Sequence, residues 1–273
     1  MTVDVTFWGV RGSLPCPTPD HLAFGGNTSC VTVEAAGQII ILDAGTGIFA
    51  LGKDMMRRGV TSATLLLSHA HIDHILGFPF FGPVWSGDFS LTVMAGNLTP
   101  TGGVRRVFDQ VLGDPLFPVP VQAMSGVTSF HDFAAGTTFM LGPDVLVKTI
   151  PLNHPNGASA YRIESGGRAV CYVTDVEHEA GTLDQDILAF IKDCDLLIYD
   201  STYSDEEYVK KVGWGHSTWQ QGVRLSKAAN VKRYAVFHHD PDHTDDIMRE
   251  VEASVTNLWR NAFVAREGMI IRL

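Results

Sequence analysis

The sequence has few cysteines, and they are not spaced as cross-linking or zinc-binding cysteines usually are. Cys16, Cys30, Cys171 and Cys194 lie far apart, and none forms a C-x-x-C pair. A zinc ribbon or a disulfide framework is therefore not expected, and we interpret the four residues as buried free thiols.

The chain also lacks long apolar runs and an excess of basic residues. No apolar stretch approaches the roughly 18 residues that cross a bilayer, and residues 1–7 resemble a strand more than a signal segment. We therefore expect no membrane association and a cytoplasmic location. The formal net charge of −10 disfavours long nucleic acid as a partner, because such binding depends on Lys and Arg that neutralise phosphates. A small anionic substrate remains compatible, since divalent cations can reverse the local charge.

What the sequence does have is enough apolar material for a large core. The chain has 273 residues, of which 45% are hydrophobic, and its 27 Gly and 13 Pro mark many turns. No repeat, low-complexity segment or linker divides it. We expect a single domain over residues 1–273, built from two strand-and-helix halves.

The most informative stretch is Ser68-His69-Ala70-His71-Ile72-Asp73-His74, which follows the apolar run Thr64–Leu67. The run has the length and bounds of a buried strand. In extended backbone His69 and His71 point the same way, whereas Asp73 and His74 lie beyond the corner. Nitrogen and oxygen donors at this density suit a borderline divalent metal such as zinc, with manganese or iron as alternatives.

This H-x-H-x-D-H spacing at a strand end resembles the signature of the metallo-β-lactamase-fold hydrolases. The resemblance implies an α/β protein with an αββα four-layer sandwich. It also implies a binuclear metal centre with two divalent ions, Zn²⁺ first and Mn²⁺ or Fe²⁺ as alternatives. Members with a redox di-iron centre usually have Glu at the position of His71, so the chain resembles the hydrolytic branch.

The resemblance implies a set of seven ligands from distant parts of the chain. The first metal would be held by His69, His71 and His154, and the second by Asp73, His74 and His238, with Asp175 bridging. Choosing His238 over His239 rests on the similarity of the strand before it to the last-ligand strand of tRNA 3′-processing endonucleases. Neighbouring residues on a strand face opposite ways, so His239 would lie outside the ligand set.

A Gly-His-Ser-Thr run at 215–218 precedes a predicted helix and resembles the phosphodiesterase branch of the same family. This resemblance implies that His216 is a general acid for the leaving alkoxide and that Asp200, at a predicted strand end, orients it. A solvent-facing His at a helix start is the alternative. Asp73 would be both a ligand and a catalytic residue, beside a bridging hydroxide activated by the two metals.

Two glycine-rich runs near the N-terminus contain candidates for substrate contact. Arg11 and Asn27 would face a phosphate or a sugar, with ordinary turn residues as the alternative. These runs resemble bacterial cyclic-phosphate diesterases. The tRNA-processing enzymes typically insert a long arm between the residues that match His154 and Asp175. Here that segment is predicted to be a plain hairpin.

We therefore expect a metal-dependent phosphodiesterase that hydrolyses a small cyclic or linear nucleotide. The alternatives are a carboxyl ester, thioester or lactam hydrolase, a tRNA 3′-processing-like ribonuclease, and a metal-stabilised binding protein without turnover. Trp85, Phe117 and Trp214 are aromatic residues that could shape a pocket or the contact of a homodimer.

Four further expectations concern local structure. Asp43, at a strand end, is either an acceptor for a ligand His or a helix cap. We expect His131 to be a hydrogen-bonded core or edge histidine rather than a ligand. Residues 75–81 are expected to begin a helix, and residues 113–126, which contain three prolines, to form an irregular flap.

Overall fold

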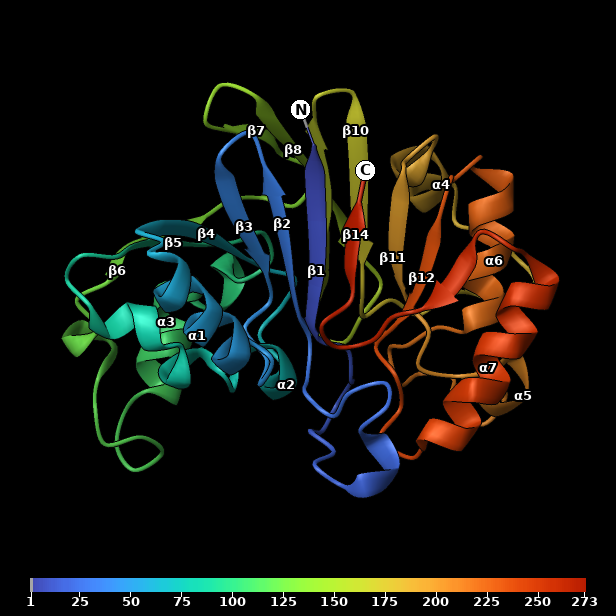
Figure 1. Ribbon diagram of the computed structural model, residues 1–273, viewed down its shortest axis with the longest axis horizontal. Helices are drawn as coiled ribbons and strands as arrows, with labels where there is room; N and C mark the ends of the chain where they lie inside the picture. The colour runs from blue at the N-terminus through green and yellow to red at the C-terminus, as the bar shows by residue number, and fades with distance from the viewer. Residues whose placement is uncertain (1) are drawn as a thin grey trace.

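The computed structural model describes residues 2–273. Two seven-stranded sheets pack against each other, and helices cover the outer face of each (Figure 1). The layers run helix, sheet, sheet, helix, which confirms the αββα four-layer sandwich of the α/β class.

The first sheet has the strand order β14-β1-β2-β3-β4-β5-β6. Its strands are β1 Val3–Gly9, β2 Cys30–Ala35, β3 Gln38–Leu42, β4 Ser62–Leu67, β5 Ser90–Ala95, β6 Val127–Asp132 and β14 Ile270–Arg272. The sheet is mixed, since β14, β1, β2 and β3 pair antiparallel. The strands from β3 to β6 pair parallel.

The second sheet has the order β13-β12-β11-β10-β9-β8-β7. Its strands are β7 Thr138–Leu141, β8 Val145–Leu152, β9 Ala158–Ser165, β10 Arg168–Val173, β11 Leu196–Asp200, β12 Tyr234–Phe237 and β13 Ala262–Val264. The strands β10 to β13 pair parallel. Every residue of β11 and β12 is buried, as expected for parallel strands that are covered on both faces.

The α-helices lie outside the sheets and the 3-10 helices in the connecting segments. The α-helices are α1 Ile48–Arg58, α2 Ile72–Ile75, α3 Val104–Val111, α4 Gln185–Ile191, α5 Asp205–Tyr208, α6 Trp219–Ala228 and α7 Asp245–Leu258. The 3-10 helices are η1 Pro19–His21, η2 Phe78–Phe80, η3 Gly82–Trp85, η4 Thr99–Thr101 and η5 Val121–Ala123. In Figure 1, α1 and α3 lie beside the first sheet, and α4, α6 and α7 beside the second.

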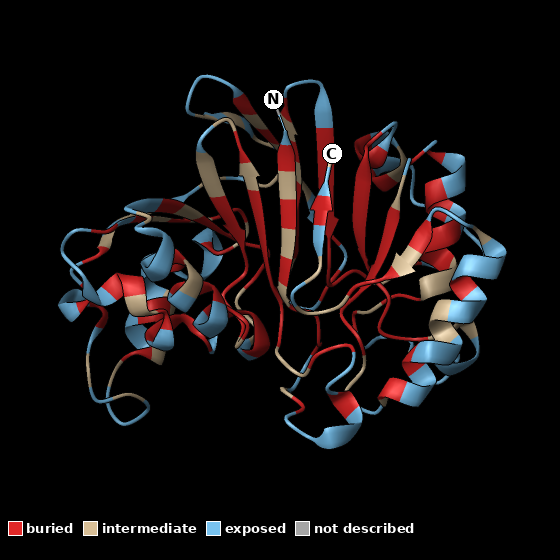
Figure 2. Ribbon diagram, viewed as in Figure 1, coloured by how far each residue is buried: buried red, intermediate tan, exposed pale blue. Residues whose placement is uncertain are grey.

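Three apolar clusters hold these layers together, as the red segments of Figure 2 indicate. One lies between the two sheets and includes Phe7 and Tyr172, one from each sheet. The second joins α1 and α3 to the first sheet, and the third joins α4, α6 and α7 to the second sheet. Burial of apolar area on both faces of both sheets is the main stabilising contribution.

The predicted helix at residues 75–81 is wrong. A short helix, α2, ends at Ile75, and η2 follows after Gly77. Pro79 has no N–H to donate and interrupts a continuous helix. Gly77 also lies so close to the Gly45 carbonyl that a Cβ would be 2.1 Å from that oxygen. The 113–126 segment is irregular as predicted, apart from η5.

Within residues 2–273, no helix combines the length and the apolar character needed to cross a membrane.

Candidate metal centre

The polar side chains singled out in the sequence follow strands that end at one edge of the two sheets. Strands β3 and β4 run parallel in the first sheet. In the second sheet β10, β11 and β12 run parallel, and β8 has the same direction because two antiparallel pairings separate it from β10. The residues at or just after these ends are Asp43, His69, His154, Asp175, Asp200 and His238. The fold thus brings distant residues together.

Three of these residues have an unusual backbone conformation. Asp43, Asp175 and His238 have φ values of 63°, 59° and 63°, in the left-handed region. Such a conformation costs on the order of 1–3 kcal/mol at a non-glycine residue and persists only where the surroundings enforce it. It turns the chain sharply at the strand end. Strain at three clustered polar residues indicates a functional site.

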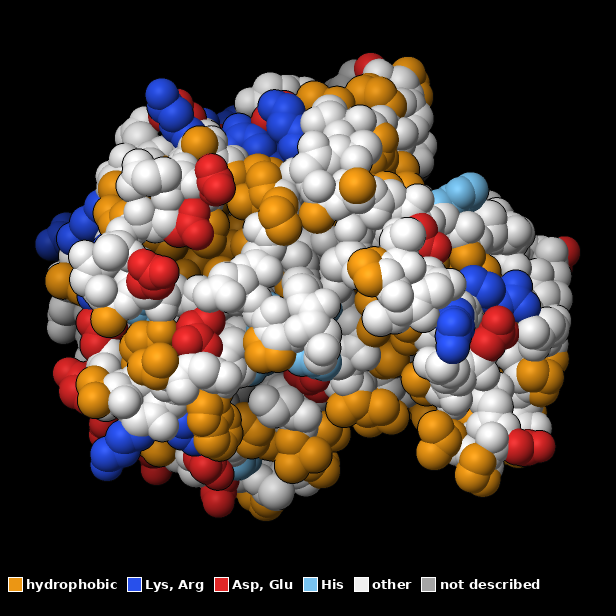
Figure 3. All heavy atoms as spheres, turned by 180° about the vertical axis from the view of Figure 1, so that it is seen from behind, with side chains coloured by type: hydrophobic (Ala, Val, Ile, Leu, Met, Phe, Trp, Pro, Cys, Tyr) orange, Lys and Arg blue, Asp and Glu red, His pale blue; other side chains and the backbone are white. Residues whose placement is uncertain are grey.

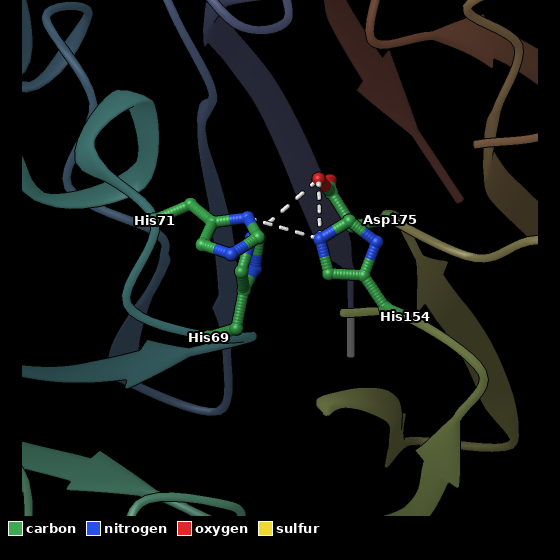
Figure 4. A group of neighbouring side chains, drawn as sticks. All are labelled: His69, His71, His154 and Asp175. Atoms are coloured by element: carbon green, nitrogen blue, oxygen red, sulfur yellow. Dashed lines mark hydrogen bonds and ion pairs between the residues drawn. The ribbon is translucent and has the colours of Figure 1, made fainter. Parts of the chain in front are cut away.

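The first cluster contains His69, His71, His154 and Asp175, whose side chains point toward one another in Figure 4. The His154 Nε2 lies 3.0 Å from the His71 Nδ1. The Asp175 Oδ2 lies 3.5 Å from the His69 Nε2 and 3.6 Å from the His154 Nε2. The cluster therefore presents three nitrogens and one carboxylate oxygen to a common point.

The second cluster contains Asp73, His74 and His238. The Nε2 atoms of His74 and His238 are 3.3 Å apart, and the Asp73 Oδ2 lies 3.3 and 3.5 Å from them. The other oxygen of Asp175, Oδ1, lies 3.3 Å from the His74 Nε2 and 3.2 Å from the His238 Nε2. Asp175 thus faces one cluster with each of its oxygens.

The hydrogen bonds behind these imidazoles determine which nitrogen faces inward. The Nδ1–H of His74 donates to the Asp43 Oδ2 at 2.8 Å, and that of His154 donates to the Gly215 carbonyl at 2.7 Å. These oxygens can only accept, so each Nδ1 carries a proton, and Nε2 is the nitrogen of each ring that can bind a cation in the cluster. Burial opposes a charge on His74, but the carboxylates of Asp175, Asp73 and Asp43 outweigh it and raise its pKa well above the usual value. A divalent cation would take the place of that proton.

The donors therefore fit divalent metal ions. The buried Nε2 of His69 has no hydrogen-bond partner within the described chain, although it faces the first cluster. Burial acts to raise the pKa of Asp73 and of Asp175, but the surrounding histidines outweigh it and hold both pKa values below the usual range. Both groups are thus ionised at neutral pH. Imidazole and carboxylate are ligands that zinc and similar divalent ions accept.

Asp43 anchors the metal-facing segment from behind. It is fully buried, and its Oδ1 accepts the Ser68 N–H at 2.7 Å. Its Oδ2 accepts the His74 Nδ1–H and the hydroxyls of Ser68 and Tyr172, each at 2.8 Å. Of the two roles expected for Asp43, the acceptor role is the one observed. Tyr172 was not anticipated, because a Tyr inside an apolar strand gives no sign of the partner of its hydroxyl.

His216 and Asp200 form a close pair beside both clusters. The His216 Nδ1–H donates to the Asp200 Oδ2 at 2.9 Å, and the His216 ring lies 4.9 Å from that of His238. Asp200 also accepts bonds from Val176 and Thr202. Burial acts to lower the pKa of His216, but the Asp200 carboxylate outweighs it and raises that pKa to about 9.

His238, not His239, faces the clusters. The His239 Nε2–H donates to the Ala265 carbonyl at 2.9 Å, in a fully buried position away from the ligands. The Nδ1 of His238 bonds to the Thr202 hydroxyl at 3.0 Å, so its Nε2 is directed at Asp175.

Arg11 does not face the site as the substrate-contact prediction required. Its side chain has 0% exposure, and its guanidinium donates to the carbonyls of Gly25, Asp240 and His243. These bonds tie the N-terminal loop to the segment after β12. Burial lowers the pKa of Arg11 despite nearby carboxylates, and its role is structural.

Asn27 is also held by the protein itself. Its side-chain amide donates to the Glu267 Oε2 at 2.9 Å, and its backbone N–H donates to the Glu267 Oε1. Glu267 is 240 positions away in the sequence, so the residues around Asn27 gave no sign of this partner. The predicted substrate contact is therefore not observed.

A backbone contact from the same loop does reach the site. The Ser13 N–H donates to the Asp73 Oδ2 at 2.7 Å, with Ser13 at a φ of 61°. A Cβ on Gly12 would lie 2.2 Å from the His238 ring. The glycine-rich run thus packs against the second cluster through its backbone. His131 lies on the edge strand β6 and outside both clusters, as predicted, but it is exposed, and its side chain makes no hydrogen bond within residues 2–273, contrary to expectation.

Two histidines of the site, His71 and His216, are partly exposed, whereas the other members of the two clusters are buried. Figure 3 shows, from behind, a hollow near the lower middle with histidine and acidic side chains in it and hydrophobic side chains around it.

Comparison with known proteins agrees with this geometry. Residues 38–239 match the beta-lactamase superfamily domain. Ribonuclease Z from Halobacterium salinarum is 25% identical over 317 residues, covering 98% of this chain and 97% of that protein. Among solved structures, the metallo-beta-lactamase fold protein YhfI from Bacillus subtilis has a TM-score of 0.75 at 18% identity, covering 100% of this chain and 99% of that one. Zn²⁺-bound PqqB from Methylobacterium extorquens has a TM-score of 0.74 at 19% identity, covering 99% and 100%.

The matched residues make up most of the chain and include strands β3 to β12 and all but the N-terminal contacts of the site. The chain belongs to the beta-lactamase superfamily, with the metallo-β-lactamase fold.

Proposed function

We propose that the protein is a di-metal phosphodiesterase that hydrolyses a small cyclic or linear nucleotide. In this proposal the first cation is bound by His69, His71 and His154, the second by Asp73, His74 and His238, and Asp175 lies between them. All 273 residues would act as one catalytic domain, because the ligands come from both sheets.

The observation that carries the proposal is the pair of His216 and Asp200. The carboxylate holds the Nδ1–H of His216 at 2.9 Å, which leaves the Nε2–H free for a substrate. Both oxygens of Asp200 already accept other bonds, so the pair is better suited to proton transfer than to binding a cation. A phosphodiester with an alkoxide leaving group needs such a donor at neutral pH.

Divalent cations in the two clusters would lower the pKa of a water molecule and stabilise negative charge on a phosphoryl group. The protein's own groups supply the rest. Asp73, ionised and fixed by the Ser13 N–H, can accept a hydrogen bond from the attacking water. His216 donates its Nε2 proton to the departing oxygen, and Asp200 stabilises the imidazolium beforehand.

Three features favour a small substrate. The segment between His154 and Asp175 is the β9–β10 hairpin, with no inserted arm. The alignment with ribonuclease Z spans 317 residues although this chain has 273, so that relative has segments without a counterpart here. The net charge of −10 also disfavours a long polyanion. Cleavage at the 3′ end of tRNA is the second candidate, which the name of that relative favours.

We propose Zn²⁺ as the metal, with Mn²⁺ and Fe²⁺ as alternatives. The facing donors are nitrogen and carboxylate oxygen only, which zinc accepts readily. The Zn²⁺ bound by PqqB, which shares the fold, supports this choice.

The experiment is a substrate screen with defined metal content. Protein loaded with Zn²⁺ or Mn²⁺ is assayed on bis(p-nitrophenyl) phosphate, on 2′,3′- and 3′,5′-cyclic nucleotides, on a carboxyl ester and on precursor tRNA. Turnover of phosphodiesters supports the proposal, and turnover of the carboxyl ester alone contradicts it.

A variant tests the acid role directly. His216→Ala should reduce hydrolysis of alkyl phosphodiesters about 10²–10⁴-fold, the usual contribution of general acid catalysis. Hydrolysis of p-nitrophenyl esters should fall much less, because p-nitrophenolate leaves without a proton. Equal losses on both substrates would exclude His216 as the acid.

A further inference from the structure

The turn formed by residues 209–215 connects α5 to His216 and is firmly fixed. The Glu177 carboxylate accepts the Gly213 N–H at 2.7 Å and the Gly215 N–H at 2.6 Å, one on each oxygen. Both glycines have positive φ values, of 89° and 85°, which other residues rarely adopt. Between them, Trp214 is 59% exposed. A well-fixed turn therefore holds a large aromatic side chain in solvent.

Lys211 lies against this tryptophan. Its Nζ is 4.0 Å from the centre of the Trp214 ring and 5.6 Å from that of Tyr203. The salt bridges within residues 2–273 do not include Lys211. One face of the indole is covered by the ammonium group, so the exposed area of Trp214 must come largely from its edge and its other face.

These side chains form a continuous series from solvent to the acid. The Tyr203 ring lies 6.1 Å from that of His216. The turn also contacts the first metal cluster, because the Gly215 carbonyl accepts the His154 Nδ1–H at 2.7 Å. In the proposed reaction His216 gives its proton to the leaving oxygen. The leaving group therefore lies on the side of the site where the 209–215 turn is.

We propose that the 209–215 turn binds the leaving group and that this group is a nucleotide, with its base stacked on Trp214 and its own phosphate paired with Lys211. The inference rests on the proposed phosphodiesterase function and specifies its substrate. An aromatic face beside an uncompensated cation matches a base and a phosphate. An acyl chain or a simple alcohol would use neither the π face nor the charge.

The reaction is a hydrolysis that balances without a redox partner. Water adds oxygen to phosphorus, and the P–O bond to the leaving nucleotide breaks. The His216 proton goes to the departing oxygen, and a proton from water restores it. The products are a phosphomonoester and a nucleotide with a free hydroxyl group.

The first test compares two substrates that share one half. Metal-loaded protein is assayed on thymidylyl-thymidine, whose leaving group is a nucleoside, and on the methyl ester of thymidine 5′-phosphate, whose leaving group is methanol. Trp214→Leu should lower kcat/KM for the dinucleoside at least about tenfold more than for the methyl ester, as expected from loss of one base stack. Trp214→Phe, which keeps an aromatic face, should restore most of the difference.

The second test concerns the charge and has a neighbouring lysine as its control. A terminal phosphate on the leaving half of the dinucleotide should raise kcat/KM, because it can pair with Lys211. Lys211→Met should abolish that gain. Lys210→Met removes the same charge one position away, where the lysine is not among the cation–π pairs of the described residues, and this variant should keep the gain. Equal effects of the two lysine variants would overturn the phosphate contact.

A binding measurement separates this inference from the proposed function. The Kd of metal-loaded protein for thymidine 5′-phosphate, measured by equilibrium dialysis, should rise at least about fivefold in Trp214→Leu. An unchanged Kd together with equal losses on both substrates refutes the inference while the phosphodiesterase function stands. Absence of turnover on every phosphodiester by the unmodified protein refutes the function, and this inference with it.

Discussion

Asp43 offers a test of how the metal clusters are held from behind. Its carboxylate makes no direct contact with a cation site, yet it accepts four hydrogen bonds, one of them from the His74 Nδ1–H. Asp43→Asn preserves the shape of the side chain. Asn also adopts the left-handed backbone readily, so the φ of 63° at this position does not oppose the change.

The substitution replaces a negative acceptor by a neutral amide with one oxygen. In either orientation its NH₂ group faces a donor, which is the Ser68 N–H in one case and the His74 Nδ1–H in the other. Loss of the carboxylate makes His74 a weaker ligand and lets its proton move to Nε2, the nitrogen that faces the cluster. Loss of an outer hydrogen-bond partner of this kind lowers metal affinity about 10–100-fold, which corresponds to about 1.4–2.7 kcal/mol.

Competition with a chelator measures the two metal affinities of Asp43→Asn, and thermal unfolding measures its stability. Asp195→Asn is the matched control, because Asp195 is also a buried carboxylate with several partners. It precedes β11, at the opposite end from Asp200, so this variant should lose stability while keeping its metal affinity. Wild-type affinity in Asp43→Asn would refute the argument that this carboxylate maintains the ligand state of His74.

Three further outcomes follow from the geometry. Asp200→Asn should shift the alkaline limb of the pH–rate profile for alkyl phosphodiesters to lower pH by at least about one unit. The carboxylate raises the pKa of His216 to about 9. The protonated acid, and with it the activity, is therefore present below that pKa and is lost as the pH rises through it. An unchanged alkaline limb would show that another group titrates. Gly12→Ala should lower activity at least about tenfold through displacement of His238, since its Cβ would lie 2.2 Å from that ring. Gly87→Ala should be neutral, because its Cβ would meet only the Ser125 Oγ, at an ordinary contact distance of 3.9 Å. Removal of the metal with a chelator should lower the Tm by at least about 5 °C. The reason is that a metal which binds only the folded state stabilises it by about 2.7 kcal/mol when its concentration is about a hundred times Kd. An unchanged Tm would show that the ions are not held in the folded protein.

The parts of the fold that the sequence predicts well are those with strong local patterns. The apolar residues of β4 and β12 are nearly continuous, and those of β8 alternate with partly exposed ones. A histidine follows β4, β8 and β12 and Asp175 follows β10, and these polar residues mark the strand ends. The compact motif from His69 to His74 needs no tertiary information, because all four donors lie within six residues. The structure then brings His154, Asp175 and His238 within reach of that motif.

The remaining features depend on partners far apart in the chain. The Arg11 guanidinium contacts carbonyls more than 200 positions away, so the Arg of a Gly-Val-Arg-Gly run that was predicted to contact a substrate joins two parts of the protein instead. Strand β6 has no fully buried residue and few apolar ones, and the edge strand β13 has only three residues. Their apolar patterns are too weak or too brief to be distinguished from loops.

The position of the ligands at the seam between the sheets connects metal binding to the packing of the whole protein. The stretch from His69 to His74 belongs to the first sheet, whereas His154, Asp175 and His238 belong to the second. Without cations, this arrangement buries imidazoles and ionised carboxylates at the seam, and their loss of hydration opposes close approach of the two sheets. Divalent cations would offset that cost and join the sheets through their strand ends. The strained backbone at Asp175 and His238 is then stabilised from two directions, by the apolar cluster between the sheets and by the ions at its edge. We therefore expect metal loading to slow hydrogen exchange in β4 and β12 together, and protection confined to one sheet would contradict this coupling.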